Sequence, residues 1–157
     1  GFLRQFRSVE IQLSINIWNY IRYHNKDITI TVVGHSLGGG LASLAALYFT
    51  ECYYNIPIKC VTFGSPRVGN RRFVKLFNKK VDSYRYVNHT DPIPSFPLAV
   101  RYSHVDGLLY INKNGKISTS HTDNRVLNFI SGLFLMLYGY ECPLSDHSCD
   151  NYYSSLS

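Results

Sequence analysis

The sequence predicts an α/β protein in which a mostly parallel sheet is flanked by helices, and two features of the 157-residue chain indicate this fold. First, short β-branched runs alternate with segments of helical apolar spacing from the start of the chain to about residue 87. Second, the pentapeptide G-H-S-L-G at 34–38 lies between one such run and a helix-like segment. Because 45% of the residues are hydrophobic and 17% are charged, we expect one folded domain over residues 1–157.

The first part of the chain alternates helix and strand. Residues 2–23 place apolar side chains every three or four positions, which predicts one amphipathic helix. Residues 28–33 are β-branched and uncharged, which predicts a strand, and residues 41–49 predict a buried helix that ends near 53–55. A strand at 58–63, a helix at 70–79 and a strand at 84–87 follow. This order predicts parallel strands with helices packed on both faces.

The pattern changes after residue 92. The proline-rich residues 92–97 predict a loop, and extended stretches are expected at 100–105 and 108–112. Asn114 and Gly115 predict a hairpin turn into a strand near 116–119. We expect a helix over 126–138 and a polar, loop-like tail from 142 to 157.

The pentapeptide at 34–38 is the signature of a nucleophile elbow, a tight turn that exposes a serine between a strand and a helix. We expect Gly34 and Gly38 to be required, because side chains two residues on either side of Ser36 would collide. The helix begins directly behind the serine, so its free N–H groups face any oxyanion formed there. The sequence therefore predicts Ser36 as the nucleophile and the Leu37 N–H as an oxyanion donor. The alternative is a serine in a structural glycine-rich turn.

A nucleophilic serine needs a base and an orienting acid, and in elbow hydrolases the acid precedes the histidine in the chain. Asp91 follows the strand at 84–87, at the carboxyl edge of a parallel sheet where ligands collect. Asp82 precedes that strand and is expected at the opposite edge, while Asp106 lies in a predicted turn. From spacing alone, Asp91 fits a catalytic acid and an Asx-turn residue before Pro92 about equally well.

Three histidines follow Asp91 and are candidates for the base. His104 lies in an extended run, where a structural role is expected, and His121 lies in a polar loop. Order and position favour His147, near the C-terminus between two cysteines, although spacing alone leaves His121 open. Packing or structural hydrogen bonds are expected for the remaining histidines, His24, His35 and His89.

Charge and motif content exclude some partners. The formal net charge is +6, but no nucleic-acid recognition motif accompanies it, so nucleic acid is not an expected partner. The basic residues either form solvated helix faces or attract an anionic lipid surface. The longest apolar run, 129–140, is too short to span a bilayer. With no C-x-x-C or H-E-x-x-H motif, no zinc site is predicted.

The four cysteines allow three pairings if all are oxidised. The pairs closest in sequence are Cys52–Cys60 and Cys142–Cys149, which would close short loops. An even count favours a secreted or lumenal protein over a cytoplasmic one, and four reduced thiols are the alternative.

Several motifs jointly resemble the class 3 lipases, the fungal-type triacylglycerol lipase branch of the α/β-hydrolase fold. G-H-S-L-G-G at 34–39 resembles their elbow, and T-F-G-S-P-R-V-G-N at 62–70 resembles the stretch after their next strand. R-Y-V-N at 85–88, followed by D-P-I-P at 91–94, resembles the strand and loop that hold the catalytic aspartate. Tyr102 to Gly107 resembles the Y-x-H-x-G segment, whose histidine is not the base.

The resemblance extends to the base and to nearly the whole chain. Asp146-His147 resembles the D-H-x-x-Y element that supplies the base, with Tyr152 standing two residues later than the family pattern has it. The resemblance therefore implies a triad of Ser36, His147 and Asp91. Family members have their first strands, a second oxyanion donor and a lid upstream of the segment that Gly1–Leu3 resembles. We therefore expect an N-terminally truncated domain of a longer protein, with Leu37 as its one oxyanion donor.

The resemblance implies a serine ester hydrolase that works through an acyl-enzyme and needs no metal or organic cofactor. The expected activity is that of a lipase on acylglycerol esters, with transient contact to a membrane or lipid-droplet surface. The alternatives are an esterase or phospholipase acting on another ester, a catalytically impaired lipid-binding relative, and a peptidase of similar fold. The sequence leaves the oligomeric state open.

Overall fold

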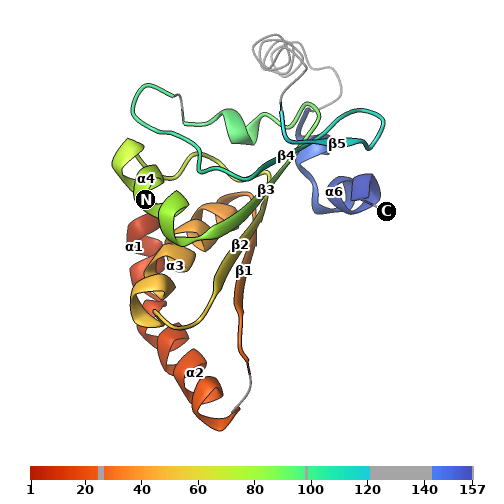
Figure 1. Cartoon of the computed structure of the whole chain (residues 1–157). Coiled ribbons are helices and arrows are strands. Elements are labelled where there is room, and N and C mark those ends of the chain that lie inside the picture. The colour runs from red at the N-terminus through yellow and green to blue at the C-terminus, as the bar shows by residue number, and fades with distance from the viewer. Residues whose placement is uncertain (25–26, 98, 121–142, 157) are drawn as a thin grey trace.

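A computed structural model describes residues 1–24, 27–97, 99–120 and 143–156, which form a twisted sheet covered by helices (Figure 1). Helices α1 to α4 lie on one side of the sheet and α6 lies on the other (Figure 1). The predicted α/β architecture is confirmed, with helices on both faces. The helices are α1 (Phe2–Arg7), α2 (Glu10–Tyr23), α3 (Leu37–Cys52), α4 (Arg71–Lys80) and α6 (Cys149–Leu156), with the 3-10 turns η1 (Ile93–Ser95) and η2 (Pro143–His147).

The sheet has five strands in sequence order: β1 (Ile30–His35), β2 (Ile58–Phe63), β3 (Asp82–Asn88), β4 (Leu108–Ile111) and β5 (Ile117–Ser118). The first four are parallel, and β5 is antiparallel to β4, as the hairpin signal at 114–115 predicts. His35 pairs with Phe63, and Phe63 pairs with Tyr86. The carboxyl ends of β1, β2 and β3 therefore meet at one edge, from which the loops that hold the polar candidates begin.

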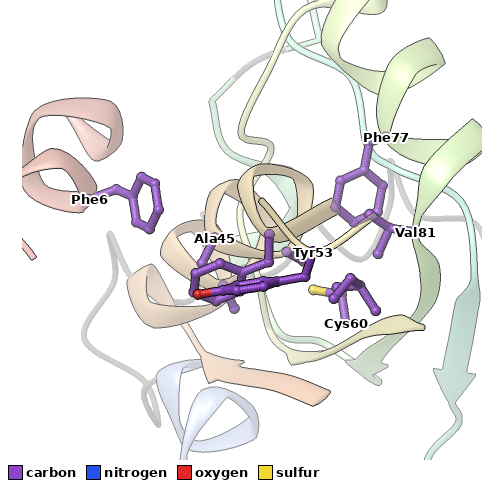
Figure 2. Packing of buried hydrophobic residues seen from close by; sticks show 10 residues of the cluster. Phe6, Ala45, Tyr53, Cys60, Phe77 and Val81 are labelled. Carbon is purple, nitrogen blue, oxygen red and sulfur yellow. The ribbon is translucent and has the colours of Figure 1, made fainter. Parts of the chain in front are cut away.

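Helix α3 is the centre of the core. Its buried residues are mostly small, so the helix packs closely on β1 and β2. Phe6 from α1 and Phe77 from α4 pack into the same cluster, with Tyr53 and Cys60 (Figure 2). The core thus fixes the position of the helix that begins directly after Ser36.

The predicted helix over 2–23 is wrong as one element, because it is divided at Ser8 and Val9. The Ser8 hydroxyl donates to the Gln5 carbonyl (2.7 Å), and Val9 has φ −122°. A serine side chain that bonds to the backbone competes with the helical ladder. Apolar periodicity continues across this break, so the pattern does not detect it.

Two expectations for the second half are also wrong. The stretch 100–105 forms no strand and pairs only through an isolated bridge between Ser103 and Gly69. The tail predicted as a loop contains η2 and α6, and Tyr152 is the buried residue of α6. A polar helix with one buried residue gives no periodic apolar signal. The predicted helix over 126–138 lies outside the described residues.

The cysteines of the described part are free. Cys60 is buried in the core and Cys52 is exposed at the end of α3, so the Cys52–Cys60 pairing is wrong. Cys149 is free and exposed, and Cys142 lies outside the described residues. Burial raises the pKa of the Cys60 thiol to about 11. Within the described ranges, no helix is both long and apolar enough to span a membrane.

Candidate active site

Ser36 occupies the turn between β1 and α3 in a strained backbone conformation. Its φ is 55° and its ψ is −129°, and it is the one non-glycine residue with positive φ in the described part of the chain. Its N–H donates to the Phe63 carbonyl (2.9 Å), which ties the turn to β2. Such a conformation costs about 1–3 kcal/mol and persists only where the surrounding structure imposes it. The local geometry is that of the predicted elbow.

Around Ser36 the structure requires glycine at positions 34 and 39, whereas the sequence predicted positions 34 and 38. A Cβ on Gly34 would lie 2.2 Å from the Gly38 carbonyl oxygen, so this glycine is required. A Cβ on Gly38 would meet nothing within 4 Å, so the expectation for Gly38 is wrong. Gly39 is the second tight position, because its Cβ would lie 2.7 Å from the Ser65 Cβ. The helix turns Gly38 outward and directs Gly39 at the loop after β2.

The structure brings Ser36, His147 and Asp91 into one hydrogen-bonded chain. His147 Nε2 lies 2.7 Å from Ser36 Oγ, and His147 Nδ1 lies 2.9 Å from Asp91 Oδ2. The Asp91 carboxyl is completely buried, and 13% of the His147 side chain is exposed. This arrangement places a hydroxyl, an imidazole and a carboxylate in the order that general-base activation of a serine requires.

Asp91 makes both of the contacts that its spacing allowed, one in an Asx turn and one to the candidate base. Its Oδ1 accepts the N–H of Ile93 (2.9 Å), which is the Asx-turn contact, while its Oδ2 faces His147. The Asp91 N–H donates to the Asn88 carbonyl (3.1 Å) at the end of β3. The turn therefore holds the carboxylate in the direction from which the histidine approaches.

Tyr152 supports the acid from α6, a contact that sequence reasoning missed. Its hydroxyl donates to Asp91 Oδ2 (2.7 Å) and accepts the Asn88 N–H (2.9 Å). Burial, and then the charge of Asp91, raise the pKa of Tyr152 above its ordinary value of 10.0, so the hydroxyl stays a donor. Its place after the histidine was the available signal, but spacing could not show that helix α6 directs the ring at Asp91.

Two further residues hold η2 against the sheet. His35 Nε2 lies 2.6 Å from the His147 carbonyl oxygen, and the two imidazole rings lie 4.6 Å apart. Asp146 accepts hydrogen bonds from the Thr90 N–H (3.1 Å) and the Thr90 hydroxyl. The segment that bears His147 is therefore tied to β1 on one side and to the loop of Asp91 on the other. The hydrogen-bonding role expected of His35 is confirmed.

The other candidate residues lie away from this chain of hydrogen bonds. His104 Nε2 lies 2.6 Å from the Pro94 carbonyl oxygen, which is a structural contact, as expected. Asp82 is exposed at the first position of β3, at the opposite edge of the sheet. His121 lies outside the described residues. His24 stacks on Tyr20, and His89 Nδ1 lies 3.8 Å from Asp146 Oδ2.

Leu37 is the first residue of α3, and the residue is 61% exposed. The first N–H groups of a helix have no acceptor within the helix, and the helix dipole places partial positive charge there.

Among the residues that the structure describes, no three His, Cys, Asp or Glu side chains are grouped as a metal site would need.

Comparison with known proteins supplies the family. Residues 1–101, more than half of the chain, match the family described as lipase (class 3). A secreted mono- and diacylglycerol lipase A of Penicillium cyclopium is 32% identical over 105 residues, which are 66% of this chain and 34% of that protein. Phospholipase A1-II 1 of Oryza sativa subsp. indica is 39% identical over 79 residues, which are 48% of this chain and 20% of that protein.

Solved structures agree in fold. The Rhizomucor miehei lipase in complex with its propeptide superposes with a TM-score of 0.70 and 28% identity, covering 83% of this chain and 45% of that one. A triacylglycerol lipase, whose catalytic centre is described as a serine protease triad, gives a TM-score of 0.73 with 26% identity, covering 82% and 54%. The chain spans about a third of the length of the first curated relatives. The family match, the shared α/β-hydrolase fold and the elbow geometry agree, and the chain belongs to the lipase (class 3) family.

Proposed function

We propose that this protein is a serine ester hydrolase that acts on lipid esters through Ser36, His147 and Asp91. The observation that carries the proposal is the continuous hydrogen-bonded chain from the Ser36 hydroxyl through both nitrogens of His147 to the buried carboxylate of Asp91. Family membership and the shared fold support the reaction class. We also propose that residues 1–157 belong to a single α/β-hydrolase domain.

The geometry suits acyl transfer to water. Asp91 holds the Nδ1–H tautomer of His147, which leaves Nε2 free to accept the proton of Ser36 as its oxygen attacks an ester carbonyl. The Leu37 N–H, at the start of α3, is the proposed donor to the tetrahedral oxyanion. His147 then protonates the leaving alcohol, and water repeats the cycle on the acyl-enzyme.

The relatives support a lipid substrate without deciding its head group. One is named a mono- and diacylglycerol lipase and another a phospholipase A1, so acylglycerols and phospholipids are the two substrate classes to compare. The matched lipases of Penicillium cyclopium and Fusarium solani are named as secreted, which supports secretion of this protein. Action at a membrane or lipid-droplet surface is part of the proposal, since its substrates would reside there.

The test is covalent labelling by a fluorophosphonate, which reacts quickly only with an activated serine. We expect labelling of the wild-type protein and its loss in Ser36→Ala. The matched control is Ser43→Ala, because Ser43 is a buried serine of α3 whose hydroxyl donates to the Gly39 carbonyl (2.9 Å). Release of fatty acid from diacylglycerol and from phosphatidylcholine vesicles then assigns the substrate class. Equal labelling of wild type and Ser36→Ala would refute the proposal.

A further inference from the structure

Gly64, the residue directly after β2, lies against the hydrogen bond between Asp91 and His147. A Cβ on Gly64 would lie 2.5 Å from Asp91 Oδ2, 2.8 Å from His147 Nδ1 and 3.0 Å from His147 Cε1. These are the two atoms that form the acid–base contact, together with the neighbouring ring carbon. The α-carbon of Gly64 thus occupies the place from which a side chain would push the pair apart.

The backbone also favours glycine at this position. Gly64 has φ +58°, a conformation that L-residues rarely adopt, and its N–H donates to the Tyr86 carbonyl (3.0 Å). This hydrogen bond ties the residue to β3, so the loop is not free to retreat from the pair. A glycine is therefore required twice, once for conformation and once for space.

We propose that Gly64 is a positioning residue, whose missing side chain lets Asp91 and His147 meet at hydrogen-bond distance. The inference rests on the proposed function, because it assigns Gly64 a role in that same catalytic chain. It adds a residue without reactive atoms to a site otherwise defined by its polar side chains.

Neither partner can yield to a methyl group without losing its contacts. Asp91 is completely buried and held by the Ile93 N–H and the Tyr152 hydroxyl. His147 is held by Ser36 at Nε2 and by His35 at its carbonyl oxygen. A methyl carbon 2.5 Å from the Asp91 oxygen is roughly 1 Å inside favourable van der Waals contact. The methyl group therefore lengthens the hydrogen bond between Asp91 and His147, or the one between His147 and Ser36.

Gly115 offers a matched control for the backbone effect. It also has positive φ (+73°), but a Cβ there would meet only the Ser155 carbonyl oxygen, at 3.5 Å, an ordinary contact. Gly115→Ala therefore introduces the same kind of backbone strain without a contact to Asp91 or His147. The difference in activity between Gly64→Ala and Gly115→Ala therefore measures the effect of the clash with Asp91 and His147 alone.

The experiment measures kcat, KM and the rate of fluorophosphonate labelling for wild type, Gly64→Ala and Gly115→Ala. A misplacement of about 1 Å at a catalytic group costs on the order of 100-fold, so we expect kcat and the labelling rate of Gly64→Ala to fall about 100-fold. We expect KM of Gly64→Ala to stay within about threefold of wild type, since substrate contacts are unchanged. Gly115→Ala should keep a kcat within about threefold of wild type.

A stability cycle covers the case in which Gly64→Ala folds poorly. Removing the carboxylate with Asp91→Ala frees space for both the methyl group and the ring, so the Tm loss caused by Gly64→Ala should be smaller in that background. Equal Tm losses in the two backgrounds, or a Gly64→Ala variant labelled as fast as Gly115→Ala, would overturn the inference. Absence of labelling in wild type would instead count against the proposed function, and the Tm cycle would still test the contact.

Discussion

Replacing Asp91 with asparagine tests how the carboxylate selects the histidine tautomer. Both carboxylate oxygens of Asp91 accept hydrogen bonds: Oδ2 from His147 and the Tyr152 hydroxyl, and Oδ1 from the Ile93 N–H. An asparagine has the same shape but offers only one oxygen, so it cannot satisfy both sides. It must choose between two orientations, each with a different consequence for His147.

With its oxygen towards His147, the asparagine would direct its NH₂ group at the Ile93 N–H, donor against donor. With the amide reversed, its oxygen satisfies Ile93 and its NH₂ donates to His147 Nδ1, which requires the Nε2–H tautomer. That tautomer cannot accept the Ser36 proton. In this reversed orientation the Tyr152 hydroxyl faces the NH₂ group and loses its acceptor. Each orientation therefore leaves one buried donor unsatisfied, at a cost of about 1–3 kcal/mol, so the unproductive tautomer is populated alongside the productive one.

Loss of the carboxylate charge adds to this effect, because the imidazolium formed during the reaction is no longer stabilised. We therefore expect Asp91→Asn to lower kcat by about 10³–10⁴ in total, with folding retained. The assay is hydrolysis of a chromogenic acyl ester, with labelling by a fluorophosphonate as an independent measure.

Asp82→Asn is the control for this variant. Asp82 is an exposed aspartate at the opposite edge of the sheet, where it accepts a hydrogen bond from the Tyr84 hydroxyl (3.2 Å). This variant should retain wild-type kcat. A kcat of Asp91→Asn within tenfold of the Asp82→Asn value would refute the tautomer argument.

Two further predictions concern stability. Tyr152→Phe keeps the ring but removes the donor to Asp91 and the acceptor of the Asn88 N–H. The free energy of unfolding, measured by urea titration, should therefore fall by about 3 kcal/mol. A loss below about 1 kcal/mol would contradict this role. For Cys60, whose pKa burial raises from 9.0 to about 11, the thiol ionises in the unfolded chain first as pH rises. The free energy of unfolding should therefore fall by about 2 kcal/mol between pH 9 and 11, and this slope should be shallower in Cys60→Ala. Parallel curves for the two proteins would show that Cys60 does not titrate in this way.

The elements that local pattern specifies were predictable from the sequence. Strands β1 and β2 and helix α3 follow from β-branched runs and a helix-forming segment, and the strained Ser36 follows from the pentapeptide between them. These features depend on residues within a few positions of one another, and the backbone sterics that govern them act over the same range. The split of the first helix was not predictable from periodicity, because the apolar spacing continues across Ser8, whose hydroxyl bonds to the Gln5 carbonyl at the break.

Tertiary structure decided what depends on residues distant in the chain. Spacing left Asp91 between two roles, and it makes both contacts because β3 and η2 end side by side at the same edge of the sheet. Helix α6 directs Tyr152 at that carboxylate although its polar sequence resembles a loop. The requirement for Gly64 arises from two residues, 27 and 83 positions later, whose contact fills the space where its side chain would lie. Sequence alone thus determined the elbow and the candidate groups, whereas packing between distant segments set their distances and their supporting contacts.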